Sequence, residues 1–220
     1  MKRAKIKVCG LTRHEDAVHA ANAGADYLGV ILVPSSPRFL SQAQAVEILG
    51  GISVPSVLVV ADQDPSETIS ASEFVGASVV QLHGHETPAD AGKIRAGGPW
   101  EVWKALRVRE PGEIEEAVAR FETHVDALLL DAWHPEMMGG TGRVFSWEAV
   151  AKIRSGFPED LKLVAAGGLN PDNVKDAIET LLPDVVDVSS GVEVGPGLKE
   201  RGLIEAFIQN ARGAGRGGLG

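Results

Sequence analysis

The sequence predicts a single-domain α/β protein, a closed (β/α)8 TIM barrel, on three observations. Short β-branched or apolar segments recur along all 220 residues, and most are apolar on both faces, as covered parallel strands are. Segments with helical spacing of apolar residues lie between them. Glycine and proline mark many of the boundaries. An open doubly wound sheet is the structural alternative, because eight strand–helix units do not by themselves show closure.

The expected strands share a short apolar run that leads into polar or glycine residues. They cover residues 5–11, 27–33, 56–62, 79–84, 101–108, 127–133, 161–168 and 185–191. Apolar residues three or four positions apart indicate helices between or after several of them. These residues are Ile114, Ala117, Val118 and Phe121, then Val174, Ala177, Ile178 and Leu181, and last Ile204, Phe207, Ile208 and Ala211.

Helix starts and ends have their own signals. Thr12 and Glu15 have the spacing of a capping box, in which each side chain binds a backbone N–H at the helix start. Asp64-Pro65, Thr87-Pro88 and Asn170-Pro171 place proline in a first helical turn. Glycines that follow the expected helices predict their ends, at Gly24, Gly50, Gly76, Gly97 and Gly156.

Composition narrows the class of protein. The chain is 44% hydrophobic with a net charge of -9, which disfavours binding to nucleic acid. No apolar run approaches the roughly 20 residues needed to span a bilayer, and one cysteine cannot form an internal disulfide. We therefore expect a cytoplasmic protein with no membrane segment. The barrel is expected to cover residues 1–212, and the glycine-rich tail 213–220 is expected to be disordered.

Polar residues gather where the expected strands end, which is where barrel enzymes carry their chemistry. The opposite ends of the strands offer no comparable set, so the sequence predicts one working end. Its candidate residues are Cys9, Arg38, Gln81, His83, Asp131, Gly167, Gly168, Asp187, Ser189, Ser190 and Gly191.

Single members of this set also have ordinary structural interpretations. Cys9 could be a small buried apolar residue, His83 could hydrogen-bond a loop, and Arg38 could be a surface charge. Asp131 is harder to explain that way. It directly follows the apolar run "ALLL", and a buried carboxylate needs a partner, a capping role or a function.

Two glycine-containing motifs predict a phosphate site. Gly167 and Gly168 follow the seventh expected strand, and Ser189, Ser190 and Gly191 follow the eighth. Glycine lets the backbone approach a ligand closely, and the loops after strands seven and eight are the recurrent phosphate site of this barrel class. The structural alternative is that these glycines only form tight turns.

The segment Gly139, Gly140, Thr141 and Gly142 follows the sixth strand and is either a mobile lid or an inert connection. No pair of histidines has the spacing of metal ligands, so no metal site is expected.

The motifs "KVCGLTR", "SPRFL", "VQLHGHE", "LLLDA", "GGTG", "AAGGLNPDNV" and "DVSSGVE…PGLKE" resemble, in order, those of the phosphoribosylanthranilate isomerase family of tryptophan biosynthesis. The resemblance covers about residues 5 to 208. The chain departs from the family pattern at Ser36, in "VVADQD" and in "RVFSW", where the family usually has a lysine, Phe-Asn and Lys with Phe-Asp-Trp.

The resemblance implies an Amadori rearrangement of N-(5-phosphoribosyl)anthranilate, with no cofactor. By similarity Asp131 is the general acid, Cys9 the general base and Arg38 the partner of the anthranilate carboxylate, while His83 and Gln81 bind substrate. An acid near pKa 3.9 would need a raised pKa, and a thiol near 8.5 a lowered one. The partner is then a small phosphorylated substrate, and the protein a monomer or homodimer.

Two other functions stay open. One is the related aminoaldose isomerisation of histidine biosynthesis, whose family has aspartate in place of Cys9 and a second phosphate site that this chain does not obviously contain. The other is a catalytically silent barrel that binds a phosphorylated metabolite.

Overall fold

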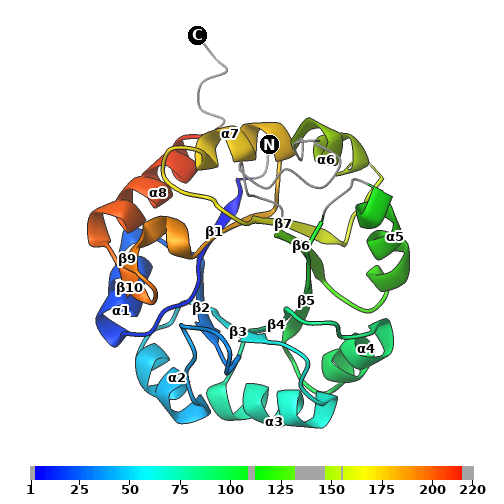
Figure 1. Ribbon diagram of the computed structural model, residues 1–220, viewed down its shortest axis with the longest axis horizontal. Coiled ribbons are helices and arrows are strands. Elements are labelled where there is room, and N and C mark those ends of the chain that lie inside the picture. Colours follow the sequence, from blue (N-terminus) through cyan, green and yellow to red (C-terminus); the bar gives the residue numbers. More distant parts are fainter. Residues whose placement is uncertain (1–2, 109–111, 132–146, 155, 215–220) are drawn as a thin grey trace.

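The protein is a closed barrel of eight parallel strands surrounded by helices, as the computed structural model shows (Figure 1). The structure describes residues 3–108, 112–131, 147–154 and 156–214. Neighbouring strands pair in chain order, and β8 closes the barrel on β1. The predicted (β/α)8 fold is confirmed, and the open sheet is excluded.

Each barrel strand lies within its predicted range. The strands are β1 (Lys5–Val8), β2 (Tyr27–Ile31), β3 (Ser56–Val60), β4 (Val79–Leu82), β5 (Glu101–Leu106), β6 (Ala127–Asp131), β7 (Lys162–Ala166) and β8 (Val185–Val188). The helices are α1 (His14–Ala23), α2 (Gln42–Leu49), α3 (Pro65–Val75), α4 (Pro88–Ala96), α5 (Gly112–Phe121), α6 (Trp147–Arg154), α7 (Val174–Leu181) and α8 (Arg201–Gly213). A short 3-10 helix η1 (Ser190–Val192) and a hairpin of β9 (Glu193–Gly195) and β10 (Leu198–Lys199) follow β8.

Several predicted helix boundaries are confirmed. Asp64 and Thr87 cap α3 and α4, each with proline in the first turn, and Thr87 forms a capping box with Asp90. Gly24 and Gly76 end α1 and α3 in the left-handed conformation that glycine favours. Gly50 and Gly97 end α2 and α4.

Two predicted helix starts are wrong. The Thr12–Glu15 capping box does not form, because Arg13 is the residue before α1 and the Thr12 hydroxyl donates to the Gly197 carbonyl at 2.5 Å. Asn170 and Pro171 precede a turn and not the first turn of α7, which begins at Val174. There the Asn170 side chain accepts from the Asp172 N–H at 2.8 Å, so it closes a local turn.

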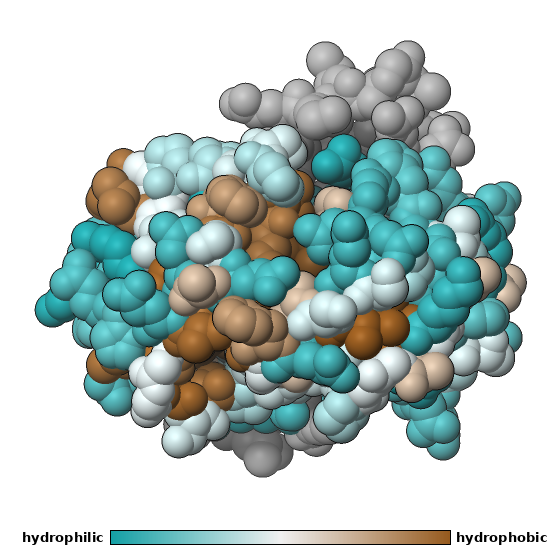
Figure 2. Space-filling model, turned by 90° about the horizontal axis from the view of Figure 1, so that it is seen from below, coloured by the Kyte–Doolittle hydropathy of each residue, from teal (hydrophilic) through white to brown (hydrophobic). Residues whose placement is uncertain are grey.

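The core has two layers. The outer layer packs the outward strand residues against the helices, and the inner layer fills the barrel with residues that include Tyr27, Trp103 and Leu129. Seen from the side of α2, α3 and α4, the outer surface is mixed, with hydrophobic residues among hydrophilic ones (Figure 2). No helix among the described ranges is long and apolar enough to cross a membrane.

Three aspartates anchor strand starts at the end of the barrel opposite the strand C-termini. The carboxylates of Asp26, Asp126 and Asp184 accept from the N–H groups of Ile6, Val102 and Leu163 at 2.8, 2.8 and 3.0 Å. Each aspartate N–H donates back to the carbonyl of the same residue.

This polar set corrects the sequence analysis, which found no comparable set of polar residues at that end. Each of these aspartates also binds an arginine, respectively Arg212, Arg95 and Arg154. The set therefore satisfies backbone groups at the strand starts and has a structural explanation.

Helix α8 runs to Gly213, one residue beyond the predicted boundary at 212. Residues 215–220 of the predicted tail lie outside the described residues, as do the proposed lid residues Gly139, Gly140, Thr141 and Gly142.

Candidate active site

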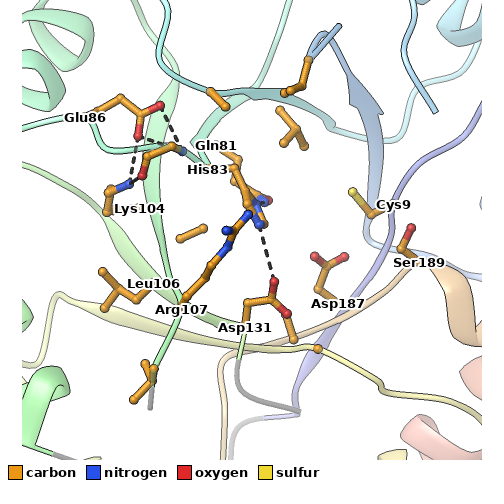
Figure 3. Close-up of a pocket in the computed structure, with 18 of the residues that line it drawn as sticks. Cys9, Gln81, His83, Glu86, Lys104, Leu106, Arg107, Asp131, Asp187 and Ser189 are labelled. Atoms are coloured by element: carbon orange, nitrogen blue, oxygen red, sulfur yellow. Dashed lines mark hydrogen bonds and ion pairs between the residues drawn. The ribbon is translucent and has the colours of Figure 1, made fainter. Parts of the chain in front are cut away.

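A cavity of ≈ 1070 Å³ opens at the C-terminal ends of the barrel strands. It is lined by ten of the eleven candidate residues, all except Gly191. Figure 3 shows Cys9, which directly follows β1, and Asp131 from β6 at this cavity, with Asp187 between them. The topology therefore brings together side chains that are far apart in the sequence.

Cys9 is held at the floor of the cavity. It is 5% exposed, and its N–H donates to the Val188 carbonyl at 2.8 Å, which fixes the end of β1 against β8. Burial raises the pKa of the Cys9 thiol above its ordinary value, and the nearby Lys7 ammonium opposes this. Lys7 is thus a cation that acts to lower the pKa of the thiol, but burial has the larger effect.

Lys7 is a buried cation that the sequence analysis missed. It is fully buried inside the barrel, and its Nζ binds Asp187 Oδ2 at 2.9 Å and Gln81 Oε1 at 2.7 Å. Burial acts to lower the pKa of Lys7, but Asp187 and Cys9 together raise it, so the side chain is an ammonium. The alternation Lys5, Lys7, Cys9 was the available signal, since it puts Lys7 on the same strand face as Cys9.

His83 and Asp131 face each other across the ends of β4 and β6. His83 Nε2 lies 3.5 Å from Asp131 Oδ2, and the other ring nitrogen, Nδ1, lies 2.8 Å from Gln81 Nε2 (Figure 3). Gln81 is 1% exposed, and both of its polar atoms have a partner inside the protein. Gln81 thus presents no unpaired polar atom to a ligand.

The loop after β4 is held by a second buried ion pair, which the sequence analysis also missed. Lys104 Nζ binds Glu86 Oε2 at 2.8 Å and the Gly84 carbonyl at 2.7 Å. Glu86 in turn accepts from the Asp62 and Gly84 N–H groups. These contacts fix the segment that follows His83 (Figure 3).

Arg38 reaches the other side of the cavity and is held by Glu193. Its Nε and Nη2 atoms bind the two carboxylate oxygens of Glu193 at 2.8 and 2.5 Å. This is one edge of the guanidinium, so the edge formed by Nη1 and Nη2 is available for a second carboxylate.

Glu193 also binds Lys199, a buried lysine after β8 whose pKa is lowered by burial. Lys199 Nζ donates to the Cys9 and Ser189 carbonyls at 2.5 and 3.1 Å, which ties the β9–β10 hairpin to the floor of the cavity. Arg38, Lys199 and Glu193 together carry one excess positive charge, which favours an anion at this side.

The loops after β7 and β8 lie against each other. Gly167 and Gly168 have φ values of +85° and +65°, in the region that glycine adopts without strain. A side chain at Gly191 would collide with the Leu169 carbonyl, so only glycine allows the two loops to meet. Within the described part of the chain the Gly168 N–H has no hydrogen-bond partner, and Gly168, Ser189 and Ser190 all line the cavity.

The chain resembles known proteins in sequence over almost its whole length. The family profile of N-(5'-phosphoribosyl)anthranilate (PRA) isomerase matches residues 6–210. The N-(5'-phosphoribosyl)anthranilate isomerase of Acinetobacter calcoaceticus is 39% identical over 213 residues, which are 96% of this chain and 97% of that protein.

Solved structures of related proteins have the same fold. The crystal structure of phosphoribosylanthranilate isomerase from Thermotoga maritima has a TM-score of 0.83 and 36% identity, with 96% of this chain and 99% of that chain covered. A phosphoribosylanthranilate isomerase in complex with reduced 1-(o-carboxyphenylamino)-1-deoxyribulose 5-phosphate has the same TM-score and coverage, with 34% identity. On this match of sequence and fold, the chain belongs to the N-(5'-phosphoribosyl)anthranilate isomerase family.

Proposed function

We propose that this chain catalyses the Amadori rearrangement of N-(5-phosphoribosyl)anthranilate to 1-(2-carboxyphenylamino)-1-deoxyribulose 5-phosphate, the third step from chorismate in tryptophan biosynthesis. The observation that carries the proposal is a thiol and a carboxyl group, Cys9 and Asp131, from distant strands of the barrel at one cavity. The reaction needs one acid and one base acting on different atoms, and this pair supplies both.

The proton transfers follow from these positions. Asp131 gives its proton to the furanose ring oxygen, whose bond to the first sugar carbon breaks, and a Schiff base cation forms. The Cys9 thiolate then takes the proton from the second sugar carbon, and the electron pair of that C–H bond neutralises the cation as an enolamine. The enolamine tautomerises to the ketone, so the reaction is redox-neutral overall.

The carboxylate and the phosphate of the substrate suit different sides of the cavity. The free edge of Arg38, held by Glu193, suits the anthranilate carboxylate as a bidentate ion pair. The Gly168 N–H and the Ser189 and Ser190 side chains suit the phosphate, with Gly167 and Gly191 allowing the backbone to approach. The distance between these two sides of the cavity would orient the sugar between Cys9 and Asp131.

The test is a fluorescence assay for loss of phosphoribosylanthranilate. Cys9→Ala and Asp131→Asn should each lower kcat by about 10²–10⁴-fold, the usual contribution of a general acid or base, while the reduced product analogue still binds. Asp176→Asn, on the exposed face of α7, is the control and should keep full turnover. Near wild-type kcat in both site variants would contradict the proposal.

The same assay with the aminoaldose of histidine biosynthesis tests the second enzyme function. Tight binding of the reduced analogue without any product from either substrate would instead favour the silent barrel.

Assembly and location complete the proposal. The expected assembly is a monomer or a homodimer, and one solved structure is of monomers generated from the dimeric phosphoribosylanthranilate isomerase of Thermotoga maritima. Light scattering separates a monomer of 23.1 kDa from a particle of twice that mass. We propose the cytoplasm as the place of action, because a base that works as a free thiolate suits a reducing compartment.

A further inference from the structure

Gln81 has a defined orientation that follows from its neighbours. Its Oε1 lies 2.7 Å from Lys7 Nζ, and its Nε2 lies 2.8 Å from His83 Nδ1. A lysine ammonium only donates hydrogen bonds, so the amide oxygen must face Lys7. The amide NH2 group must then face His83.

The orientation of Gln81 determines where His83 carries its proton. The amide NH2 only donates, so His83 Nδ1 must accept and is unprotonated. A neutral imidazole has one N–H, which therefore lies on Nε2. That atom faces Asp131 Oδ2 at 3.5 Å, a long contact of the kind that shortens when substrate binds.

We propose that Gln81 is a positioning residue that fixes His83 as the Nε2–H tautomer, so that the ring presents a donor to Oδ2 of Asp131. Lys7 fixes Gln81 in turn. The importance of Asp131 in this inference rests on the proposed function, whereas the tautomer of His83 does not.

The arrangement has a consequence for the acid. Because Oδ2 of Asp131 faces the His83 donor, the acidic proton resides on Oδ1. When that proton moves to the ring oxygen, the new carboxylate already has a hydrogen-bond donor in place.

The Lys7 ammonium connects the surroundings of Cys9 with those of Asp131. Lys7 interacts with the Cys9 thiol on one side and with Gln81 on the other, and so a polar chain runs from Cys9 through Lys7, Gln81 and His83 to Asp131. Other charged groups face this chain: Asp187 from β8, Lys199 and Arg38 near Cys9, and Arg107, which directly follows β5 and reaches toward His83 (Figure 3).

Nitrogen-15 NMR of the resting protein tests the tautomer directly at neutral pH. We expect His83 Nε2 to resonate as a protonated nitrogen and Nδ1 as an unprotonated one. The chain has six histidines, and His83→Gln identifies the His83 signals by their absence. A proton on Nδ1, or on both nitrogens, would overturn the proposal without any assay of activity.

Gln81→Glu tests the positioning role. A carboxylate at residue 81 still accepts from Lys7 but cannot donate to His83, so the ring should gain a proton on Nδ1. We expect kcat to fall by about tenfold to a hundredfold with little change in KM. Gln63→Glu is the matched control, because Gln63 donates to the Leu32 carbonyl outside this chain of contacts and should leave kcat unchanged.

His83→Gln and His83→Ala complete the test. A glutamine amide can place a donor nitrogen where Nε2 of His83 lies, so His83→Gln should keep more kcat than His83→Ala. Equal kcat in these two variants, or wild-type kcat in Gln81→Glu, would overturn the positioning role. If the tautomer is as expected but no variant or wild-type protein isomerises the substrate, the proposed function fails and the tautomer assignment stands.

Discussion

Gly29 on β2 makes room for the thiol of Cys9 on the neighbouring strand. A Cβ atom added to Gly29 would lie 2.7 Å from Cys9 Sγ and 3.0 Å from Cys9 Cα. It would also lie 3.1 Å from Cε of Lys7, whose side chain passes through the barrel beneath the cavity. The position of Cys9 therefore depends on the absence of a side chain on the adjacent strand.

Gly29→Ala should displace Cys9 and lower activity. Because one of the close atoms is a backbone atom, a change of rotamer cannot relieve the contact. We expect kcat to fall by at least about tenfold and stability by about 1–3 kcal/mol, the usual range for overpacking. Enzyme assay and urea unfolding measure the two effects. Gly112→Ala is the control, since its Cβ would meet nothing within 4 Å; equal effects of the two changes would contradict the prediction.

The pKa of Cys9 predicts how activity depends on pH. Burial raises this pKa above its ordinary value, so in the free enzyme the thiolate forms only at higher pH. The value of kcat/KM should therefore rise with pH as the thiolate forms. Absorbance at 240 nm follows the thiolate, and the signal belongs to Cys9 because the chain has one cysteine.

Asp187→Asn should shift that titration in a known direction. The negative charge of Asp187 raises the pKa of Cys9, so its removal should let the thiolate form at lower pH. The rise in kcat/KM should move to lower pH together with the absorbance. A titration that stays in place or moves to higher pH would show that Asp187 does not act on the thiol through its charge.

Arg38→Lys should weaken substrate binding more than it slows chemistry. A lysine has one charged nitrogen and cannot bind Glu193 and a substrate carboxylate with two separate edges. Loss of one charge-assisted interaction of about 1.5–3 kcal/mol corresponds to a rise in KM of about tenfold to a hundredfold. Steady-state kinetics measure this rise, with Arg95→Lys as a control at the opposite end of the barrel. An unchanged KM would remove Arg38 from the carboxylate site.

Asp126→Ala should lower stability and leave activity intact. Asp126 accepts from the Val102 N–H at 2.8 Å and from Arg95 at 2.7 Å, and its loss leaves a strand N–H without its acceptor. We expect a cost of about 1–3 kcal/mol in urea unfolding with wild-type kcat. Asp160→Ala removes an exposed carboxylate in a turn and should cost much less. A fall in kcat in Asp126→Ala would show that the two ends of the barrel are coupled.

The regular part of this structure could be predicted from the sequence because its causes are local. Strands that are apolar on both faces, proline after Asp64 or Thr87, and glycine at Gly24 or Gly76 each specify their element within a few residues. The capping box predicted at Thr12 is wrong because the partner of Thr12 is distant in the sequence. Its hydroxyl binds the carbonyl of Gly197, which no local pattern reveals.

The candidate site was predictable as a set of strand ends but not as a network. By its sequence alone, Lys7 is typical of an amphipathic strand. Its hydrogen-bond partners, Gln81 and Asp187, lie 74 and 180 positions away in the chain. The pairing of Arg38 with Glu193 likewise joins residues 155 positions apart. Such contacts depend on barrel closure, so they follow from the fold and not from spacing.

The same hydrogen-bond arrangement occurs three times at the end of the barrel that faces away from the cavity, at Asp26, Asp126 and Asp184. Each holds the start of a strand through its own pair of hydrogen bonds, at the end of the barrel opposite Cys9. The loops around the cavity could therefore be exchanged, in evolution or by protein engineering. The three aspartates at the opposite end would still hold the strands of the barrel together. New specificities in such a scaffold would then arise without loss of the framework that supports them.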